Sequence, residues 1–490
     1  MKTIKRLSIF LILGLVFFLF SCEPRESEIP SHFDLRSLGY VTPVKTQAVI
    51  DEYWNNVGLC WAYAAIASFE SSMLMQGIVT NPHLREANLS PWHIGNHIGH
   101  NHPNLSFNQT AFGNPPVPVG YALDETLQYG WGGSVLFAVE WLSQGYGFVF
   151  DEDAPLPLED MYNRVDLTPP LRDLNMHYML RSALIYERYK YDSDEAYRNT
   201  LKKAIMNYGA AASPMYLTIG DVPGQSGLTY YRDDYYIDYY VDDPNLENHL
   251  VHMVTIVGWD DDYQIQGAPN QGAWIIKDSM GSYLHDQGYM MIAYDDTVFL
   301  KGYSYAVILV ADDGLNYRVE RYQSNQGILS YPVRPETMFL STGFNDLQVE
   351  SWGSAKFSAT DDHFLKAIGL ATKNHNEQVK IMVHQGFGIN GEPVHMMHEE
   401  TFLIKEQGYH VVDLKELVAL TKDVDFYITI GFTYKASREE PLVYVMNPLN
   451  SNLNHTWIAS KDHEGRFHWV NTHQVIENSV FYIQGIIQKN

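Results

Sequence analysis

The chain contains only two cysteines in 490 residues, and this scarcity limits the fold more than any other feature of the sequence. At most one disulfide can form, so stability must come from packed cores rather than from a cross-linked scaffold. A chain of this length is expected to divide into two or more domains, each with its own core. Cys22 follows an apolar run and Cys60 begins a predicted helix. These separate contexts argue against a disulfide between them.

The composition excludes some classes of partner. Hydrophobic residues make up 46% and charged residues 19% of the chain, which is typical of globular domains. The formal net charge is −25. Nucleic-acid binding needs clustered lysine and arginine, so we do not expect a nucleic-acid partner. The acidic surface is consistent with an exported protein.

Residues 1–22 form a targeting segment. Three basic residues, Lys2, Lys5 and Arg6, precede an apolar stretch at 7–20 that is too short to span a bilayer comfortably. The segment ends LFSC, which resembles the bacterial lipoprotein signal. That resemblance implies an exported protein with a lipid on Cys22, anchored to a bacterial membrane or at the cell surface. The alternative is a plain secretory signal with an incidental cysteine.

Three further segments follow the signal. Residues 23–30 form a polar linker, too short for an inhibitory pro-segment, and residues 31–312 mix helical and strand patterns. A helix is predicted from Cys60 to Gln76, closed by Gly77, and another at 134–143. Short apolar strands are predicted at 253–257 and 273–276.

Residues 313–490 have a different residue pattern. Apolar, β-branched and aromatic runs alternate with Gly, Asn and Asp turns; the clearest runs lie at 379–383, 426–432, 442–445 and 481–483. This pattern predicts an all-β sandwich domain. The fold class is therefore α+β, with a mixed domain followed by an all-β domain.

The residues around Cys60 indicate nucleophilic catalysis. A helix N-terminus favours the thiolate, which is the reactive form of cysteine. Such a nucleophile needs a base, a group that orients the base, and a donor for the oxyanion. His252 begins an apolar strand and Asp278 follows the next strand, so two adjacent strands would bring them together. Gln47, upstream of Cys60, could supply the donor.

These motifs resemble those of the papain family of cysteine peptidases. The matching segments read IPSHFDLR at 29–36, VTPVKTQ at 41–47, GLCWAY at 58–63 and HMVTIVGW at 252–259, with Gly281 and the GYM of 288–290 after Asp278. The resemblance implies a two-lobed peptidase domain that hydrolyses peptide bonds of peptides or proteins through a thioester.

The same resemblance assigns a role to each residue of the site. It makes Cys60 the nucleophile, His252 the acid–base, Gln47 the oxyanion donor and Asp278 the orienting group. Gly132 and Gly133 resemble the glycine pair that admits the substrate backbone.

Two positions depart from the family pattern. Asp278 stands where the family has Asn, and Met280 where it has Trp. A carboxylate beside the imidazole is expected to raise the pKa of His252. The departures leave open a catalytically weak or dead surface lipoprotein that acts as an adhesin or sugar-binding protein. A third reading keeps the acyl-enzyme chemistry for transpeptidation or for small amides.

The all-β region resembles the lectin-like domain that follows the peptidase domain in some bacterial relatives. Residues 351–359 and 364–369 carry this match. A carbohydrate or protein ligand is one expectation, but a fold does not by itself establish sugar binding, and a structural role is an equal expectation.

We expect no metal and no other cofactor. His93, His97, His100 and His102 lie close together in the sequence, but no cysteine or carboxylate accompanies them, so we predict a solvated loop. The run at 260–262 holds three aspartates without the alternation of a calcium loop, which indicates surface acidity.

Overall fold

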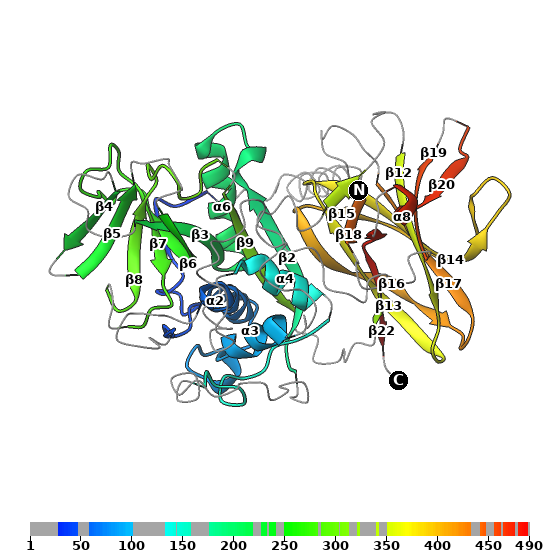
Figure 1. Ribbon diagram of the computed structural model, residues 1–490, viewed down its shortest axis with the longest axis horizontal. Coiled ribbons are helices and arrows are strands. Elements are labelled where there is room, and N and C mark those ends of the chain that lie inside the picture. The colour runs from blue at the N-terminus through cyan, green and yellow to red at the C-terminus, as the bar shows by residue number, and fades with distance from the viewer. Residues whose placement is uncertain are drawn as a thin grey trace, which may run out of the picture.

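The computed structural model describes residues 28–47, 58–100, 133–143, 145–157, 176–218, 227–232, 235–241, 249–282, 286–302, 304–312, 321–323, 340–342, 350–432, 442–446, 455–461, 464–475 and 479–488. They form two domains that lie side by side, one of helices packed on a sheet and one a β-sandwich (Figure 1). Among the helices of these segments, none has both the length and the apolar character needed to cross a bilayer.

Helix α2 (Cys60–Met75) is the buried helix that the sequence predicted. Nearly all of its residues are shielded from solvent, including Cys60 at its first position. The helix ends where expected, because Gly77 just beyond the cap has a φ of 70°, a left-handed conformation that glycine adopts readily. The predicted second helix forms α4 (Val135–Ser143).

A sheet forms the framework of the N-terminal domain. Its strands run in the order β2 (Met179–Glu187), β9 (Tyr305–Asp312), β3 (Ala211–Thr218), β6 (His249–Asp260), β7 (Ala273–Lys277), β8 (Tyr289–Ala293), β5 (Tyr235–Val241) and β4 (Gly227–Arg232), and β1 (His32–Asp34) pairs with β6. The two strands predicted at 253–257 and 273–276 are therefore β6 and β7, and they are adjacent and antiparallel.

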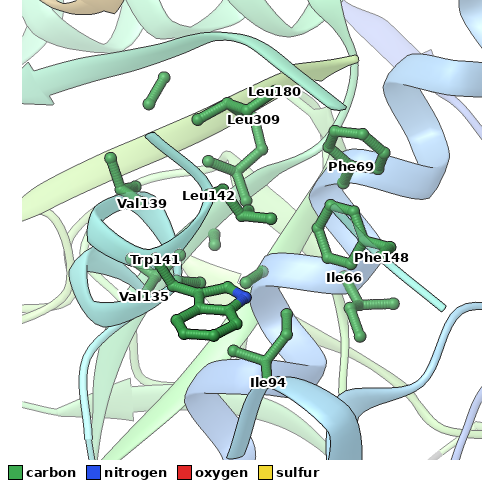
Figure 2. Close-up of a cluster of buried hydrophobic side chains, with 14 of the residues drawn as sticks. Ile66, Phe69, Ile94, Val135, Val139, Trp141, Leu142, Phe148, Leu180 and Leu309 are labelled. Carbon is green, nitrogen blue, oxygen red and sulfur yellow. The ribbon is translucent and has the colours of Figure 1, made fainter. Parts of the chain in front are cut away.

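Helices cover both faces of this sheet. Successive side chains of a strand point to opposite faces. In β9, Val307 and Leu309 join the core beside α2, whereas Ala306 and Ile308 join the core beneath α6 (Asp194–Tyr208). Figure 2 shows the core beside α2, where Ile66, Phe69, Val139, Leu142 and Phe148 are among the residues that converge.

The histidine-rich stretch was predicted wrongly. Residues 91–100 form helix α3 (Pro91–His100), which packs against α2 and α4, and His93 is 0% exposed. Trp92 and Ile94 are buried with it and draw this turn into the core, so it is not a solvated loop. His102 lies outside the described residues. In the described part of the chain, no three His, Cys, Asp or Glu side chains gather as metal ligands would.

The C-terminal domain is the predicted β-sandwich. One layer contains β10 (Arg321–Gln323), β22 (Ile483–Gln488), β13 (His363–Thr372) and β16 (Gly408–Leu420), and the other β15 (Pro393–Ile404), β14 (Glu377–Phe387), β17 (Asp425–Phe432), β12 (Glu350–Ser358), β19 (Thr456–Lys461) and β20 (Phe467–Asn471). A small sheet contains β11 (Leu340–Thr342), β18 (Leu442–Met446) and β21 (Ser479–Phe481). The described residues also include three short helices: η1 (Arg85–Ala87), η5 (Arg188–Lys190) and α8 (Thr472–Val475).

The two domains share one sheet. Strand β16 of the sandwich pairs antiparallel with β2 of the N-terminal domain, with Gly408 opposite Leu184 and His410 opposite Ser182. The core beside α2 also includes Tyr409 and Tyr482 from the sandwich. The α+β class and its division into a mixed domain and a sandwich are confirmed, and the domains are joined by backbone hydrogen bonds as well as by packing.

Candidate active site

Cys60 occupies the first position of α2 and is 8% exposed. It is a free thiol. The partial positive charge of a helix N-terminus favours an anion there, and no acidic residue lies in the first turn of α2 to compensate it. The local fold therefore suits a cysteine that reacts as a thiolate.

The neighbouring strands bring His252 and Asp278 together. His252 lies near the start of β6, and Asp278 directly follows the end of β7. The His252 Nε2 and Asp278 Oδ1 atoms are 2.8 Å apart. The Asp278 side chain is 3% exposed and that of His252 12%, so the carboxylate is buried behind the imidazole. This is the juxtaposition that the two predicted strands implied.

The charges around His252 favour its imidazolium form. Burial of the ring opposes that charge, but the carboxylate of Asp278 and the hydrogen bonds to Asp278 and Cys60 outweigh burial and raise the pKa of His252 to about 10. Because Cys60 contributes to this shift, its side chain lies near the His252 ring. Nucleophile, base and orienting carboxylate thus form one connected set.

Gln47 is held by the segment that follows Asp278. Its backbone N–H donates to the carbonyl oxygen of Ser279 at 2.7 Å, and the hydroxyl of Ser279 donates to Gln47 Oε1 at 2.7 Å. Thr46 forms a bridge with Met280 beside it. Because the amide oxygen of Gln47 faces Ser279, the amide nitrogen is the end of the side chain suited to donate to an oxyanion.

Ser279 is a residue of the site that the sequence reasoning missed. Besides its bond to Gln47, its backbone N–H donates to Asp278 Oδ1 at 2.7 Å. One residue thereby fixes both the orienting carboxylate and the oxyanion amide. Its position directly after Asp278 was visible in the sequence, but its contact with a segment more than 200 positions away was not.

The other predicted site residues are placed only in part. Gly133 lies so close to Trp61 that a Cβ atom would come within 2.5 Å of the indole nitrogen. Packing against Trp61 therefore favours glycine at this position. Gly132 and Cys22 lie outside the described residues. Met280, at the position where the family has Trp, is half-buried.

Two family models match the sequence. Residues 132–307 match the papain family of cysteine proteases, and residues 335–483 match the lectin like domain. The first match includes His252 and Asp278, whereas Cys60 and Gln47 lie upstream of it. A curated relative, a cathepsin L-like peptidase of Aedes aegypti, is 23% identical over 273 residues, which cover 55% of this chain and 61% of the relative. The chain thus matches less than two thirds of that relative's length.

Two solved structures are similar to nearly the whole chain. They are the clostridial cysteine protease Cwp84 after propeptide cleavage, and the cysteine protease and lectin-like domains of Cwp84, a surface layer associated protein of Clostridium difficile. Both have a TM-score of 0.66 and cover 94% of this chain; the identities are 20% and 19%, over 100% and 90% of the solved chains. At this identity the likeness shows the fold. Over residues 132–307 the chain thus matches the papain family of cysteine proteases, over residues 335–483 it matches the lectin like domain, and as a whole it has the two-domain fold of these solved structures.

Proposed function

We propose that the protein is a cysteine peptidase in which Cys60 is the nucleophile. The observation that carries the proposal is the connected set of Cys60, His252 and Asp278, with Gln47 held beside it by Ser279. A catalytically dead binding protein would be free to lose this arrangement.

Each residue has a defined step in the reaction. The Cys60 thiolate attacks the carbonyl carbon of a peptide bond, and the amide of Gln47 donates to the oxyanion that forms. His252 then gives its proton to the leaving amine, so the amine departs and a thioester remains on Cys60. Neutral His252 next takes a proton from water, which attacks the thioester. A carboxylic acid leaves, and the thiolate–imidazolium pair is restored.

Asp278 supports both protonation states that His252 passes through. Its carboxylate accepts a hydrogen bond from the Nε2–H group and keeps the ring oriented, so that the other ring nitrogen faces the thiol. It also stabilises the imidazolium that donates to the leaving amine. The site therefore uses a cysteine–histidine–aspartate arrangement in which the family has an amide.

A thiol-directed probe tests the proposal most directly. Mature protein without residues 1–22 would be incubated with an epoxysuccinyl probe and its intact mass measured, with Cys60→Ala and a denatured sample as controls. We expect one label per folded wild-type chain and none in either control. If the wild-type protein takes the label, unlabelled enzyme would then be screened against peptide substrates across a range of pH.

The same experiment decides against the alternative. A folded protein that takes no label and cleaves no peptide would be a catalytically dead binding protein, as the departures at Asp278 and Met280 allow. The geometry favours the active form, because Asp278 Oδ1 accepts hydrogen bonds from both His252 and the Ser279 N–H.

We also propose that the enzyme is exported and anchored through a lipid on Cys22. The support is the basic, apolar and LFSC sequence of residues 1–22. The similar protein Cwp84 is described as surface layer associated, which is consistent with an exported enzyme. A surface location would give it peptides or proteins outside the cell as substrates.

For the lectin-like domain we propose a structural role. The support is its shared sheet with the N-terminal domain and its contribution of Tyr409 and Tyr482 to the core beside α2. A carbohydrate or protein ligand stays an expectation from the sequence, since a lectin fold carries no sugar specificity by itself.

A further inference from the structure

A charged cluster is buried beneath the active site. Its members are Glu70 in α2, Lys45 in the segment that leads to Gln47, and Lys277 at the end of β7. Glu70 is 0% exposed and Lys277 is 5% exposed, and the Lys45 side chain is 18% exposed. Burying charges costs free energy unless they are paired and hydrogen-bonded, so such a cluster needs complete partners.

Hydrogen bonds join the cluster into one unit. Lys45 Nζ donates to Glu70 Oε1 at 2.7 Å and to the carbonyl oxygen of Leu89 at 2.6 Å, and the Leu89 N–H donates to the same carboxylate oxygen at 2.9 Å. The other oxygen, Oε2, accepts from the hydroxyl of Thr42. Lys277 Nζ donates to the Thr42 carbonyl at 2.8 Å and to its hydroxyl oxygen at 3.0 Å.

The cluster connects the three segments that supply the active site. Helix α2 carries Cys60 and Glu70, and the segment at 41–47 carries Thr42, Lys45 and Gln47. Strand β7 ends at Lys277, whose next residue is Asp278. A shift of any one segment would therefore break a charged hydrogen bond inside the protein.

Stability alone does not account for this arrangement. Apolar residues of similar volume are often as stabilising as a buried ion pair, or more so. Burial lowers the pKa of Lys277 to about 8; the charge of Glu70 acts to raise this pKa and the charge of Lys45 acts to lower it. Keeping a charged ammonium group at this position therefore costs free energy of folding. The neutral amine still donates hydrogen bonds, so the link to Thr42 does not depend on the charge.

We propose that Lys277, Thr42 and Glu70 are positioning residues for catalysis, which hold the nucleophile helix, the oxyanion segment and the orienting carboxylate in register. They touch neither the substrate nor the reacting atoms. The proposal rests on the peptidase function proposed above.

Lys277→Met is the main test, because it removes the donor and keeps the length of the side chain. We expect kcat to fall about 10- to 100-fold while KM changes less than about threefold, since a small displacement of catalytic groups costs up to about a hundredfold. Lys277→Arg, which restores donors to Thr42, should recover much of the loss. Thr42→Val and Thr42→Ser form a milder pair, in which only the valine loses the hydroxyl.

A matched control separates positioning from general stability. Lys202 in α6 is 2% exposed and pairs with Asp261 at 2.5 Å, away from the site, so Lys202→Met removes an equally buried cation. We expect it to lower the melting temperature and leave kcat per labelled active site near wild type. Equal kcat values in Lys277→Met, Thr42→Val and Lys202→Met would overturn the proposal. Failure of the wild type itself to take the epoxysuccinyl label would instead refute the peptidase function.

Discussion

At the scale of single residues, Asp278 differs from the family's asparagine by one charge, and that charge acts directly on the base. Its oxygen accepts from His252 and from the Ser279 N–H, and an asparagine oxygen could accept both bonds in the same place. Asp278→Asn therefore changes the charge and leaves the geometry intact. The substitution isolates the electrostatic contribution of the carboxylate.

We predict that Asp278→Asn moves the alkaline limit of kcat/KM to lower pH by at least about one unit. The carboxylate raises the pKa of His252 to about 10 from an ordinary 6.5, and a neutral amide cannot do so. The matching stability contribution is present in full below pH 6.5 and disappears as the pH rises through about 10. Rates of epoxysuccinyl labelling between pH 5 and 11 would check it, and identical alkaline limits would contradict it.

The sequence predicted which residues the structure brings together at the candidate site, but not which residues support them. Cys60, His252, Asp278 and Gln47 stand in motifs with recognisable neighbours. Glu70 is the single charge in an apolar helix, and Lys277 ends an apolar strand. Each was a visible irregularity, but its partners lie far away in the chain, so no local pattern indicated the pairing.

At the scale of elements, the two predicted helices, α2 and α4, were bounded more accurately than the strands, whereas α3 was missed. The ends of α2 follow from local chemistry, since Gly77 supplies the left-handed stop. Strand β6 extends beyond its apolar middle because β3 pairs with its first residues and β1 with its last. Those partners supply backbone hydrogen bonds to residues that local hydrophobicity does not mark as strand.

The pairing of β16 with β2 gives a prediction at this scale. Gly408 has a φ of 129°, and a Cβ atom there would lie 1.8 Å from the Ala183 carbonyl oxygen. Gly408→Ala should separate the two strands and lower the free energy of unfolding by about 2–3 kcal/mol. Urea unfolding and hydrogen exchange of the β2 and β16 amides would measure the effect.

Gly465 provides the control for backbone conformation. It has a φ of 81°, and a Cβ atom added there would meet no other atom within 4 Å, so Gly465→Ala tests positive φ without a clash. We expect a cost of about 1–2 kcal/mol and normal exchange in β2 and β16. If both variants lose the same stability and exchange alike, the clash with Ala183 does not matter and the strand pairing is not the sensitive feature.

At the scale of the whole molecule, the first described residues of the chain and His252 lie at opposite ends of one strand. Phe33 in β1 pairs with Trp259, and the Trp259 indole donates to the Pro30 carbonyl at 2.9 Å. His252 lies seven positions earlier in β6, about 20–25 Å away at the rise of a β-strand. A tether that precedes residue 28 therefore joins the domain far from Cys60.

This arrangement makes the proposed anchor separable from catalysis. We predict that Cys22→Ala moves the full-length protein from the membrane fraction to the soluble fraction and leaves the rate of epoxysuccinyl labelling at Cys60 unchanged. Cys60→Ala is the complementary control, because it should stay with the membrane and take no label. Membrane retention of Cys22→Ala would contradict the lipid anchor. Slower labelling of the released enzyme would show instead that anchoring changes the reactivity of Cys60, although the length of β6 separates the active site from the attachment point of the tether.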